Sequence, residues 1–383
     1  MEATEILKQF SDTWELRHEY VKEWKHRIGG KVVGCMCTYY PEEILYAANI
    51  LPVRILGGHE APTLATPHMF DMWCPFSRDC LNQALKGKYD YLDGVLETNT
   101  CLHMRQAFGA WQIHVPTPWF YYLVTPNAVR NPRAKKFLRG ELAEFTKALE
   151  EWTGKPITDT DLDRGIEIVN KNRQLMKKVY EYRKPEKPLI TGAEAMTMVW
   201  ASQLMDKREV NPMLEQLIKE LPKREVTRET GVRLMIIGSE NDDRPFLEMV
   251  ESIGATFVIE DHCTGARYFW QEVKPGKDRL QAIADRYCDR TPCPNKDWGM
   301  EDTSRVRFKR ILEGIRDYRV QGAILTQQKF CDPHETDIPS LRRLLEENNI
   351  PTYFLEFEVT VPVGQFKIRV EAFIEQLMAE DLF

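Results

Sequence analysis

The segment MWCPFSRDCLNQALKGKYDYLDGVLETNTCL, residues 72–102, places two cysteines where one structural element gives way to the next. Cys74 is followed at once by proline and an apolar pattern typical of a helix, so we expect it at a helix N-terminus. Cys101 follows the expected strand Leu92–Thr98 and precedes a second expected helix, Leu102–Phe108. The positive end of a helix dipole favours thiolate over thiol, which suits a ligand for an anionic metal cluster.

On both sides of this segment, apolar runs of strand length alternate with amphipathic helical patterns. Residues 4–27 have a helical pattern, and a βαβ unit follows them. The parts of that unit are strand Lys31–Thr38, helix Pro41–Asn49 and strand Pro52–Leu56. One further strand, Trp111–Val115, is expected after the quoted segment. This alternation predicts an α/β layer with a mainly parallel sheet.

Between residues 131 and 230 the strand patterns stop, and long amphipathic helices punctuated by prolines are expected instead. These helices are Ala134–Trp152, Thr158–Tyr182 with Thr158 as the N-cap, and Ala193–Asp206, and the prolines are Pro185, Pro188, Pro212 and Pro222. The segment is predicted to be a helical excursion between two lobes.

The α/β alternation resumes at Val232. The expected strands are Val232–Gly238, Thr256–Asp261, Gly322–Thr326 and Thr352–Phe357, and the expected helices are Pro245–Ile253, Lys277–Tyr287, Ser304–Tyr318, Ile338–Asn348 and Gln365–Leu377. The fold class predicted is therefore α/β, with two doubly wound (Rossmann- or flavodoxin-like) domains at 1–130 and 231–383 and the helical region 131–230 between them.

Length and composition narrow the function classes. A chain of 383 residues suits two domains, and 43% hydrophobic with 29% charged residues is typical of a soluble globular protein. The net charge of −6 argues against nucleic-acid binding. The N-terminal residues MEATEILKQFSD are polar, and the apolar runs elsewhere are far short of a membrane span, so we expect a cytoplasmic protein.

The nine cysteines are an odd number, and in a cytoplasmic chain they are more readily free, metal-bound or catalytic than disulfide-bonded. Any one of them alone is more often a small buried hydrophobe. Four of them, however, lie near the carboxyl ends of expected strands, which are Cys37, Cys101, Cys263 and Cys331. Ligands of open α/β sheets bind at that edge, so a site between the lobes that includes Cys74, Cys101 and Cys331 is predicted.

The cysteine spacing matches neither the paired knuckles of a structural zinc site nor the compact ferredoxin pattern. No phosphate-binding loop of the form G-x-x-x-x-G-K-[ST] and no G-x-G-x-x-G pattern is found in the sequence. We therefore expect this chain to bind no nucleotide, and any ATP that the chemistry needs to be handled by another chain.

Several longer motifs carry a family resemblance in combination. In order they are GCMCTYYPEEILYAANILPVRILGG (34–58), CPFSR (74–78), TCLHMR (100–105), EDHCTGARYF (260–269), KFCDPHETDIPSLRRLLEENNIPTYFLEFE (329–358) and PVGQFKIRVEAF (362–373). Over most of its length the chain resembles the 2-hydroxyacyl-CoA dehydratase and benzoyl-CoA reductase family. Within that family it is most similar to the smaller cluster-carrying subunit of ATP-dependent benzoyl-CoA reductases. One departure is Ile368, which stands before Arg369 where the family usually has a hydroxyl residue.

The resemblance implies a 4Fe–4S cluster held by Cys74, Cys101 and Cys331, with one iron left without a cysteine from this chain. It implies a homologous cluster-carrying subunit as partner, so that two clusters, or a bridged double-cubane, could meet at the subunit interface. A separate ATP-hydrolysing iron–sulfur activator would supply the electrons, and a CoA thioester would be the substrate. Cys37 matches a motif near the cluster, and whether it is a ligand stays open.

The activity that the resemblance implies is reduction of the aromatic ring of benzoyl-CoA to a cyclic dienoyl-CoA. Radical dehydration of a 2-hydroxyacyl-CoA is the alternative within the family, and a bilobed protein that binds a small ligand or metal is the alternative from another class.

Other residues are weighed individually against a structural role. His103, His262 and His334 are neighbours of cysteines in the sequence and are candidates for hydrogen-bonding or proton transfer near the cluster, against ordinary packing. For Cys35 and Cys80 a core or helix-packing role is favoured, and for Cys263 a structural role near the cleft is favoured over ligation. Cys288 and Cys293 flank a turn, where a plain loop is favoured over a surface feature or a secondary metal site. Three basic residues are candidates to contact a CoA phosphate or to offset the negative charge of the cluster, against a role as solvated surface, and they are Arg78, Arg105 and Arg267. Three aromatic residues are candidates to line an acyl pocket, against core packing, and they are Trp119, Tyr121 and Tyr122.

Overall fold

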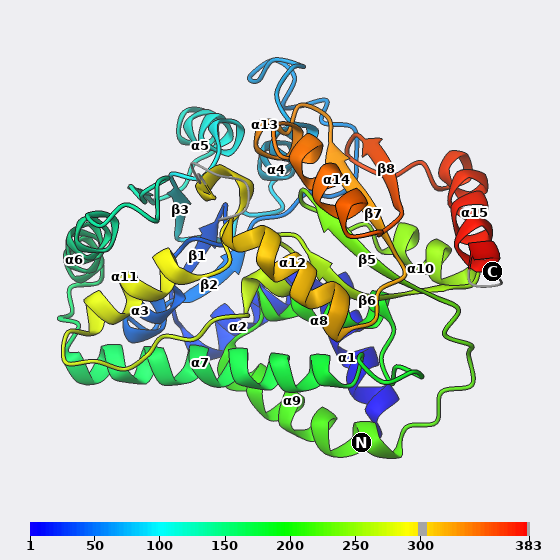
Figure 1. The fold of residues 1–383 in the computed structure, drawn as a ribbon. Helices are drawn as coiled ribbons and strands as arrows, with labels where there is room; N and C mark the ends of the chain where they lie inside the picture. The colour runs from blue at the N-terminus through cyan, green and yellow to red at the C-terminus, as the bar shows by residue number, and fades with distance from the viewer. Residues whose placement is uncertain (298–304, 381–383) are drawn as a thin grey trace.

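The computed structural model describes residues 1–297 and 305–380 and contains two parallel sheets of four strands each (Figure 1). The first sheet has the order β2-β1-β3-β4 and the second the order β6-β5-β7-β8. Their strands are β1 Val32–Cys35, β2 Leu51–Arg54, β3 Gly94–Thr98, β4 Trp119–Leu123, β5 Val232–Gly238, β6 Ala255–Asp261, β7 Gly322–Gln328 and β8 Thr352–Phe357. The prediction of two doubly wound α/β units is confirmed.

Helices cover the sheets and connect them. Those before and within the first unit are α1 Ala3–Glu15, α2 Arg17–Ile28, α3 Glu42–Ala47, α4 Pro75–Leu85, α5 Leu102–His114 and α6 Ala134–Thr153. The connecting helices are α7 Asp159–Glu181, α8 Gly192–Ser202 and α9 Lys207–Glu220. The later helices are α10 Arg244–Ser252, α11 Arg279–Asp289, α12 Val306–Asp317, α13 Asp332–Glu335, α14 Ile338–Glu347 and α15 Val363–Glu380, with short 3-10 turns η1 Leu221–Lys223, η2 Ala266–Tyr268 and η3 Pro294–Lys296.

The strand sequences explain which strands lie inside. Every residue of β1, β2, β3, β5, β6 and β7 is buried, including the edge strands β2 and β6, whereas β4 and β8 at the opposite edges are partly exposed. Strands covered by helices on both faces read as continuous apolar runs, which is why β5 and β7 are recognisable from sequence. No helix among residues 1–297 and 305–380 is long and apolar enough to cross a membrane.

Two expected elements are wrong, and the sequence patterns missed two helices, α9 and the single turn α13. Trp111–Val115 is the end of α5, and the strand is Trp119–Leu123. Trp111 is fully buried but Ile113 is 77% exposed, so the segment continues a helical stripe and does not alternate as a strand would. The expected helix 4–27 breaks at Leu16, which is the C-cap of α1. The longer of the missed helices, α9, runs on through Pro212, although proline usually interrupts a helix.

The ends of other helices follow their capping residues. Thr158 is the N-cap of α7, and its side-chain oxygen accepts a hydrogen bond from the Asp161 N–H at 3.2 Å, as predicted. The expected helix Ala193–Asp206 ends already at Ser202, because Asp206 is the N-cap of the next helix. The expected start of α12 at Ser304 lies outside the described residues.

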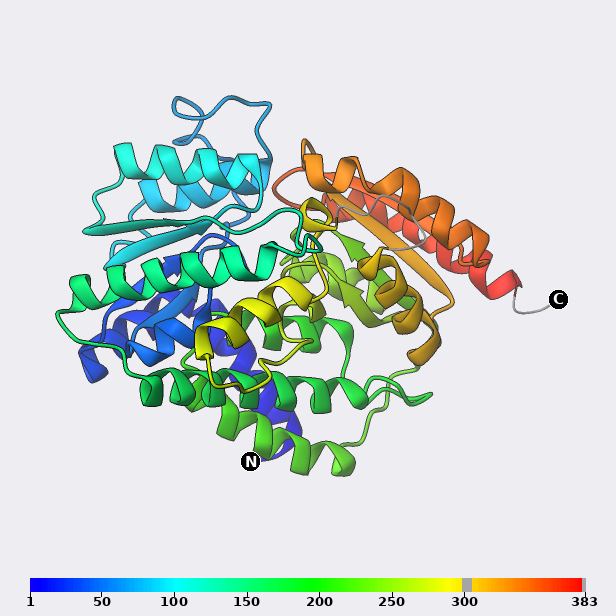
Figure 2. The same ribbon diagram turned by 60° about the vertical axis from the view of Figure 1, so that its left-hand side comes forward.

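The helices between the sheets join the two units. In Figures 1 and 2, α7 and α9 run beneath both sheets, and α8 lies against α1. Although α11 lies between β6 and β7 in the sequence, it packs against α6, which covers the first sheet (Figure 2). One continuous apolar core contains residues of both sheets, for example Val95 of β3 and Ile236 of β5. The two units are therefore packed as one body.

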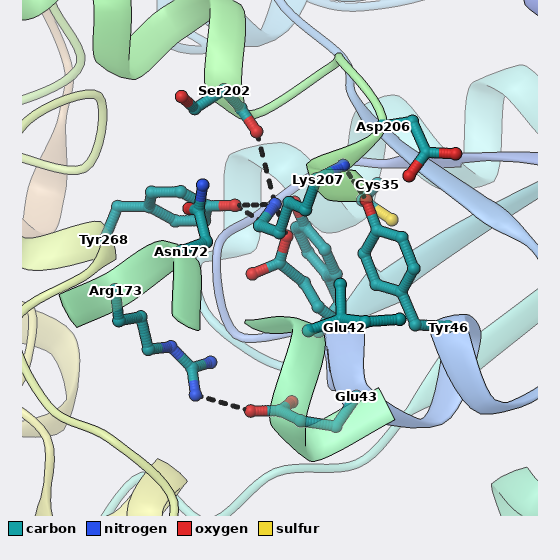
Figure 3. A network of polar contacts seen from close by, with 12 residues as sticks. Cys35, Glu42, Glu43, Tyr46, Asn172, Arg173, Ser202, Asp206, Lys207 and Tyr268 are labelled. Carbon is teal, nitrogen blue, oxygen red and sulfur yellow. Dashed lines mark hydrogen bonds and ion pairs between the residues drawn. The ribbon is translucent and has the colours of Figure 1, made fainter. Parts of the chain in front are cut away.

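A buried polar network fixes this packing (Figure 3). The Lys207 ammonium at the start of α9 forms an ion pair with Glu42 of α3 and donates to Tyr268 Oη of η2 at 2.6 Å and to the Ser202 carbonyl at 3.2 Å. The Tyr268 hydroxyl donates to Glu42 at 2.6 Å. Charges buried this deeply are tolerated only when their hydrogen bonds are satisfied, so the network specifies how α3, α9 and η2 meet.

We predict that Lys207→Met lowers the free energy of unfolding by about 3–5 kcal/mol, because Glu42 is left buried without a cation. Urea denaturation measures the change. The control is Lys8→Met, which removes the cation of the exposed Lys8–Asp12 pair and is expected to cost at most about 0.5 kcal/mol. Equal effects of the two substitutions would contradict the role given to the network.

A second prediction concerns His59, which follows β2 in the sequence and connects the two units. Its Nε2 lies 3.1 Å from Asp242 Oδ1 and its Nδ1 lies 3.1 Å from the Val359 carbonyl oxygen. Burial lowers the pKa of His59, but the carboxylates of Asp242, Asp243 and Asp79 together outweigh burial and raise the pKa to about 9. Because the pKa is higher in the folded protein, the contribution of the charge is complete below about pH 6.5 and is lost as the pH rises towards 9.

The expected result is that His59→Asn, which removes the charge and tolerates the positive φ of 57° found here, lowers the melting temperature at pH 6.5 more than at pH 9.5. Thermal unfolding followed by circular dichroism at both pH values measures this. A difference between wild type and variant that does not shrink at the higher pH would refute the charged bridge.

Candidate functional site

A cavity of about 90 Å³ lies where the carboxyl ends of both sheets meet. Its lining includes residues at or just after the ends of six strands. These are Cys37 after β1, Arg54 of β2, Cys101 after β3, Glu240 after β5, Cys263 after β6 and Cys331 after β7. Parallel strands bring such positions to one edge, so the topology itself gathers them.

Six of the nine cysteines line this cavity, and they are Cys37, Cys74, Cys101, Cys263, Cys293 and Cys331. The three predicted from the sequence to act together come from both units, Cys74 and Cys101 from the first and Cys331 from the second. The structure therefore brings the predicted residues together, and it adds three more thiols to them.

Each predicted cysteine is the N-cap of a helix. Cys74 precedes α4, Cys101 precedes α5 and Cys331 precedes the single turn α13. Proline occupies the first or second helical position after Cys74 and Cys331, where its missing N–H costs nothing. The Cys101 sulfur accepts a hydrogen bond from the Met104 N–H at 3.4 Å. The expected positions of Cys74 and Cys101 at helix starts are confirmed, and the structure adds Cys331 to them.

The thiols nevertheless differ in acidity. A hydrogen bond from Cys331, assisted by His103 and by backbone N–H groups of α4, lowers the pKa of Cys74 to about 6 in spite of burial. The same hydrogen bond, together with burial, raises the pKa of Cys331. Burial raises the pKa of Cys101 well above its usual range, and the Met104 N–H offsets this only in part. The expectation that the helix start favours thiolate is therefore wrong for Cys101, where desolvation dominates.

The other three thiols form a second group. Burial is the main cause that raises the pKa values of Cys37 and Cys263, and the electrostatic neighbours of Cys263 include both Cys37 and Cys293. Cys331 is affected by Cys74 and Cys101, and Cys101 is affected by Cys74 and also by Cys37. We call the three cysteines predicted from the sequence, Cys74, Cys101 and Cys331, the first triad, and the other three that line the cavity, Cys37, Cys263 and Cys293, the second triad.

Cys293 reaches the cavity through a segment that returns from α11. Its backbone N–H donates to Tyr39 Oη at 3.1 Å. Lys296, buried in the same segment, donates to the Asn99 carbonyl at 3.0 Å and to Thr125 Oγ1 at 2.8 Å, at the ends of β3 and β4. Sequence reasoning assigned Cys293 to a plain loop and Cys263 to a structural role. Cys263 carried the same signal as Cys101, a cysteine after a strand, but Cys293 carried none.

Two of the three candidate histidines line the cavity. His103 Nδ1 accepts the Cys74 backbone N–H at 2.8 Å, so in the neutral ring the proton is on Nε2, which lies 3.2 Å from Asp332 Oδ2. His334 is buried beside the cavity, and burial lowers its pKa well below the usual value. His262 does not line the cavity; it is fully buried, with Nδ1 2.9 Å from Thr264 Oγ1.

The other candidate groups lie elsewhere. Arg78 pairs with exposed Asp71, Arg105 is exposed over the Tyr122 ring, and Arg267 is a buried partner of Asp261. Trp119 and Tyr121 of β4 stack on each other outside the cavity lining, with ring centroids 5.7 Å apart. The aromatic run is therefore part of a sheet edge, and nothing in it faces the thiols.

The cavity offers sulfur donors, which are the ligands that iron–sulfur clusters use. Within residues 1–297 and 305–380, no three His, Cys, Asp or Glu side chains are close enough together to hold one metal ion. In an iron–sulfur cluster each cysteine binds a different iron, so the sulfurs surround the group at wider spacing. Cysteine side chains spread around one cavity are ligands of the type that such a cluster requires.

Comparison with known proteins identifies relatives along nearly the whole chain. The family model described as 2-hydroxyglutaryl-CoA dehydratase, D-component, matches residues 37–377. The chain is 25% identical to the (R)-phenyllactyl-CoA dehydratase beta subunit of Clostridium sporogenes, over 98% of this chain and 99% of the relative. It is 26% identical to a benzoyl-CoA reductase subunit of Thauera aromatica, over 97% of each. It is 24% identical to the (R)-2-hydroxyglutaryl-CoA dehydratase beta subunit of Acidaminococcus fermentans, over 91% and 93%.

Proposed function

The chain belongs to the 2-hydroxyglutaryl-CoA dehydratase D-component family, and from this premise we propose that it is the iron–sulfur subunit of an enzyme that delivers low-potential electrons to a CoA thioester. The observation that carries the proposal is the convergence of six thiols from both units on one cavity. A structural role would not require thiols at the ends of so many strands.

Cys74, Cys101 and Cys331 are proposed to hold a 4Fe–4S cluster. The second triad offers three further thiols in the same chain, so a bridged pair of clusters would find all its cysteine ligands here and would not need those of a partner subunit. When bound, such a cluster supplies single electrons at a potential that burial and nearby charge set.

The residues around the thiols exclude water and hold the ligands in place. Met36, Phe76 and Met104 contribute apolar surface to the cavity lining. His103 holds the Cys74 backbone through Nδ1 and faces Asp332 through Nε2, and so connects the two units beside the first triad. Such contacts outside the ligand residues fix the orientation of the ligands, so that moving a ligand out of place costs more free energy.

The substrate proposed is benzoyl-CoA or a close analogue, whose ring is reduced to a cyclic dienoyl-CoA. The likeness to the Thauera aromatica benzoyl-CoA reductase subunit supports it. The second candidate is radical dehydration of a 2-hydroxyacyl-CoA, which the two dehydratase beta subunits among the relatives favour. Because these relatives are named as subunits, we further propose a homologous partner subunit, and we propose a separate ATP-hydrolysing iron–sulfur activator as the electron donor.

Iron analysis tests the ligands. After anaerobic purification, we expect about four iron atoms per chain if the first triad alone is loaded and about eight if both triads are. Cys74→Ala, Cys101→Ala and Cys331→Ala should each lose at least about half of the iron. Cys288→Ala, a buried cysteine outside the cavity lining, is the matched control and should keep it. Full iron in all three triad variants would end the assignment.

Reductant stoichiometry separates the two activities. With the partner subunit and an activator present, ring reduction consumes electrons and ATP with every turnover, whereas dehydration returns the electron and needs only catalytic amounts. We expect two electrons to be consumed per molecule of benzoyl-CoA converted. Conversion of a 2-hydroxyacyl-CoA with a trace of reductant would select the dehydratase instead.

A further inference from the structure

The first sheet ends at a strand whose outer side is uncovered. β4 pairs with β3 on one side, and within residues 1–297 and 305–380 no strand pairs with it on the other. In Figure 2 it lies at the margin of the first sheet, with α5 and α6 on either side. All of its residues except Leu123 are partly exposed. Such an edge presents backbone groups to which a strand of another chain can bind.

The other three sheet edges are protected. β2 and β6 are buried throughout. β8 is partly exposed, but it carries the exposed Glu356 and is followed by the exposed Glu358, and charge on an edge strand opposes pairing with another chain. β4 lacks this protection, because no Asp, Glu, Lys or Arg occurs from residue 115 to residue 129. An uncharged aromatic edge is the kind of segment at which strands of separate chains associate.

Two residues of β4 direct their backbone groups outward. The Leu123 carbonyl accepts a hydrogen bond from the N–H of Asn99, which follows β3, so the backbone groups of Leu123 face β3. Along a strand, the N–H and C=O groups of successive residues point to opposite sides. Those of Tyr121 therefore also face β3, and those of Phe120 and Tyr122 face outward. Among the described residues, no backbone group of another segment forms a hydrogen bond with them.

The spacing of these two residues makes the edge self-complementary. When β4 meets a second β4 in antiparallel orientation, with a two-fold axis at Tyr121, Phe120 of each strand lies opposite Tyr122 of the other. Residues that face each other in this way exchange two hydrogen bonds, so all the outward groups of both residues are used. The facing side chains are aromatic, which stabilises cross-strand pairs.

We propose that the outer edge of β4 is an interface between two copies of this chain, which joins their first sheets across a two-fold axis at Tyr121. A strand of another chain would have to match this register, whereas the chain matches itself. The same surface is used on both copies, so the assembly closes at two. The proposal does not rest on the proposed function, because neither the cavity nor bound iron takes part in the interface.

The size and the surroundings of the strand set the conditions for association. Five residues in each strand make a small interface, so the dimer is expected to dissociate on dilution. Glu141 and Glu144 of α6 are electrostatic neighbours of Tyr121 and would approach their counterparts across the axis. Salt screens this repulsion, and the dimer is therefore expected to be more stable at moderate than at low ionic strength.

Molar mass measures the association. The full chain is purified without oxygen and examined by light scattering after size-exclusion chromatography, over a dilution series at moderate ionic strength. We expect twice the 44.8 kDa of one chain at high concentration, and the mass of one chain after dilution. The mass of a single chain at every concentration, or assemblies that grow beyond two copies, would overturn the proposal.

Charges placed at the axis test where the two copies meet. Tyr121→Glu and Tyr121→Lys each bring like charges opposite one another, so each variant alone should be monomeric. Mixed in equal amounts, the two should regain the dimer, because the introduced carboxylate then faces the introduced ammonium group. The matched control is Phe354→Lys, which makes the same kind of change on β8, the other exposed edge, and should stay dimeric.

Circular dichroism establishes that each variant is folded. Folded variants at Tyr121 that remain dimeric, a mixture that stays monomeric, or a monomeric Phe354→Lys would each contradict an interface at β4.

Amide hydrogen exchange of the wild-type chain requires no substitution and decides the matter if the variants do not fold. The amides of Phe120 and Tyr122 should exchange slowly at high concentration and quickly after dilution. The amide of Tyr121, which faces β3, is the internal control and should exchange slowly in both. Exchange at Phe120 and Tyr122 that is equally fast at both concentrations would refute the pairing, whatever the iron content of the chain.

Discussion

The arrangement of this molecule depends on two parallel sheets whose carboxyl ends face one cavity. Each sheet alone would leave its loops open to solvent at that edge, as doubly wound folds do. Here the ion pair between Arg54 and Glu240 and the contact between His103 and Asp332 connect the two edges beside the thiols. The network around Lys207 holds the same two units together further from the cavity. These polar contacts, together with the apolar core that both units share, fix the relative position of the residues that make up the site.

Burial at this junction keeps the free cysteines protonated, and it also makes the potential of the proposed iron–sulfur group sensitive to nearby charges. Desolvation keeps Cys101 and Cys37 as thiols in the free protein, since their pKa values are raised. A metal that binds thiolate must therefore displace protons from a site that resists ionisation, which makes loading dependent on pH. Once loaded, the same exclusion of water makes the potential sensitive to single charges in the wall, such as that of Arg54, which lines the cavity.

Much of the fold could be predicted from the sequence because the central strands are apolar on both faces. The predicted bounds of β5, Val232–Gly238, are the observed ones, and Cys74 and Cys101 lie at helix starts as expected. The error at Trp111 arises because a short apolar run fits a strand and a buried helix end equally well. Cys293 could not be found at all, since its place depends on the packing of α11 and on the hydrogen bonds of Lys296, both formed between distant segments. The pairing of Arg54 with Glu240 was likewise beyond any local pattern.

The central claim is that thiols from both units surround an iron–sulfur group in this one cavity. Diffraction from anaerobically grown crystals at wavelengths on either side of the iron absorption edge tests it most directly. The account predicts strong anomalous density inside the cavity, adjacent to the sulfurs of Cys74, Cys101 and Cys331. Iron density elsewhere on the chain, or crystals of active enzyme with no iron signal in the cavity, would contradict it.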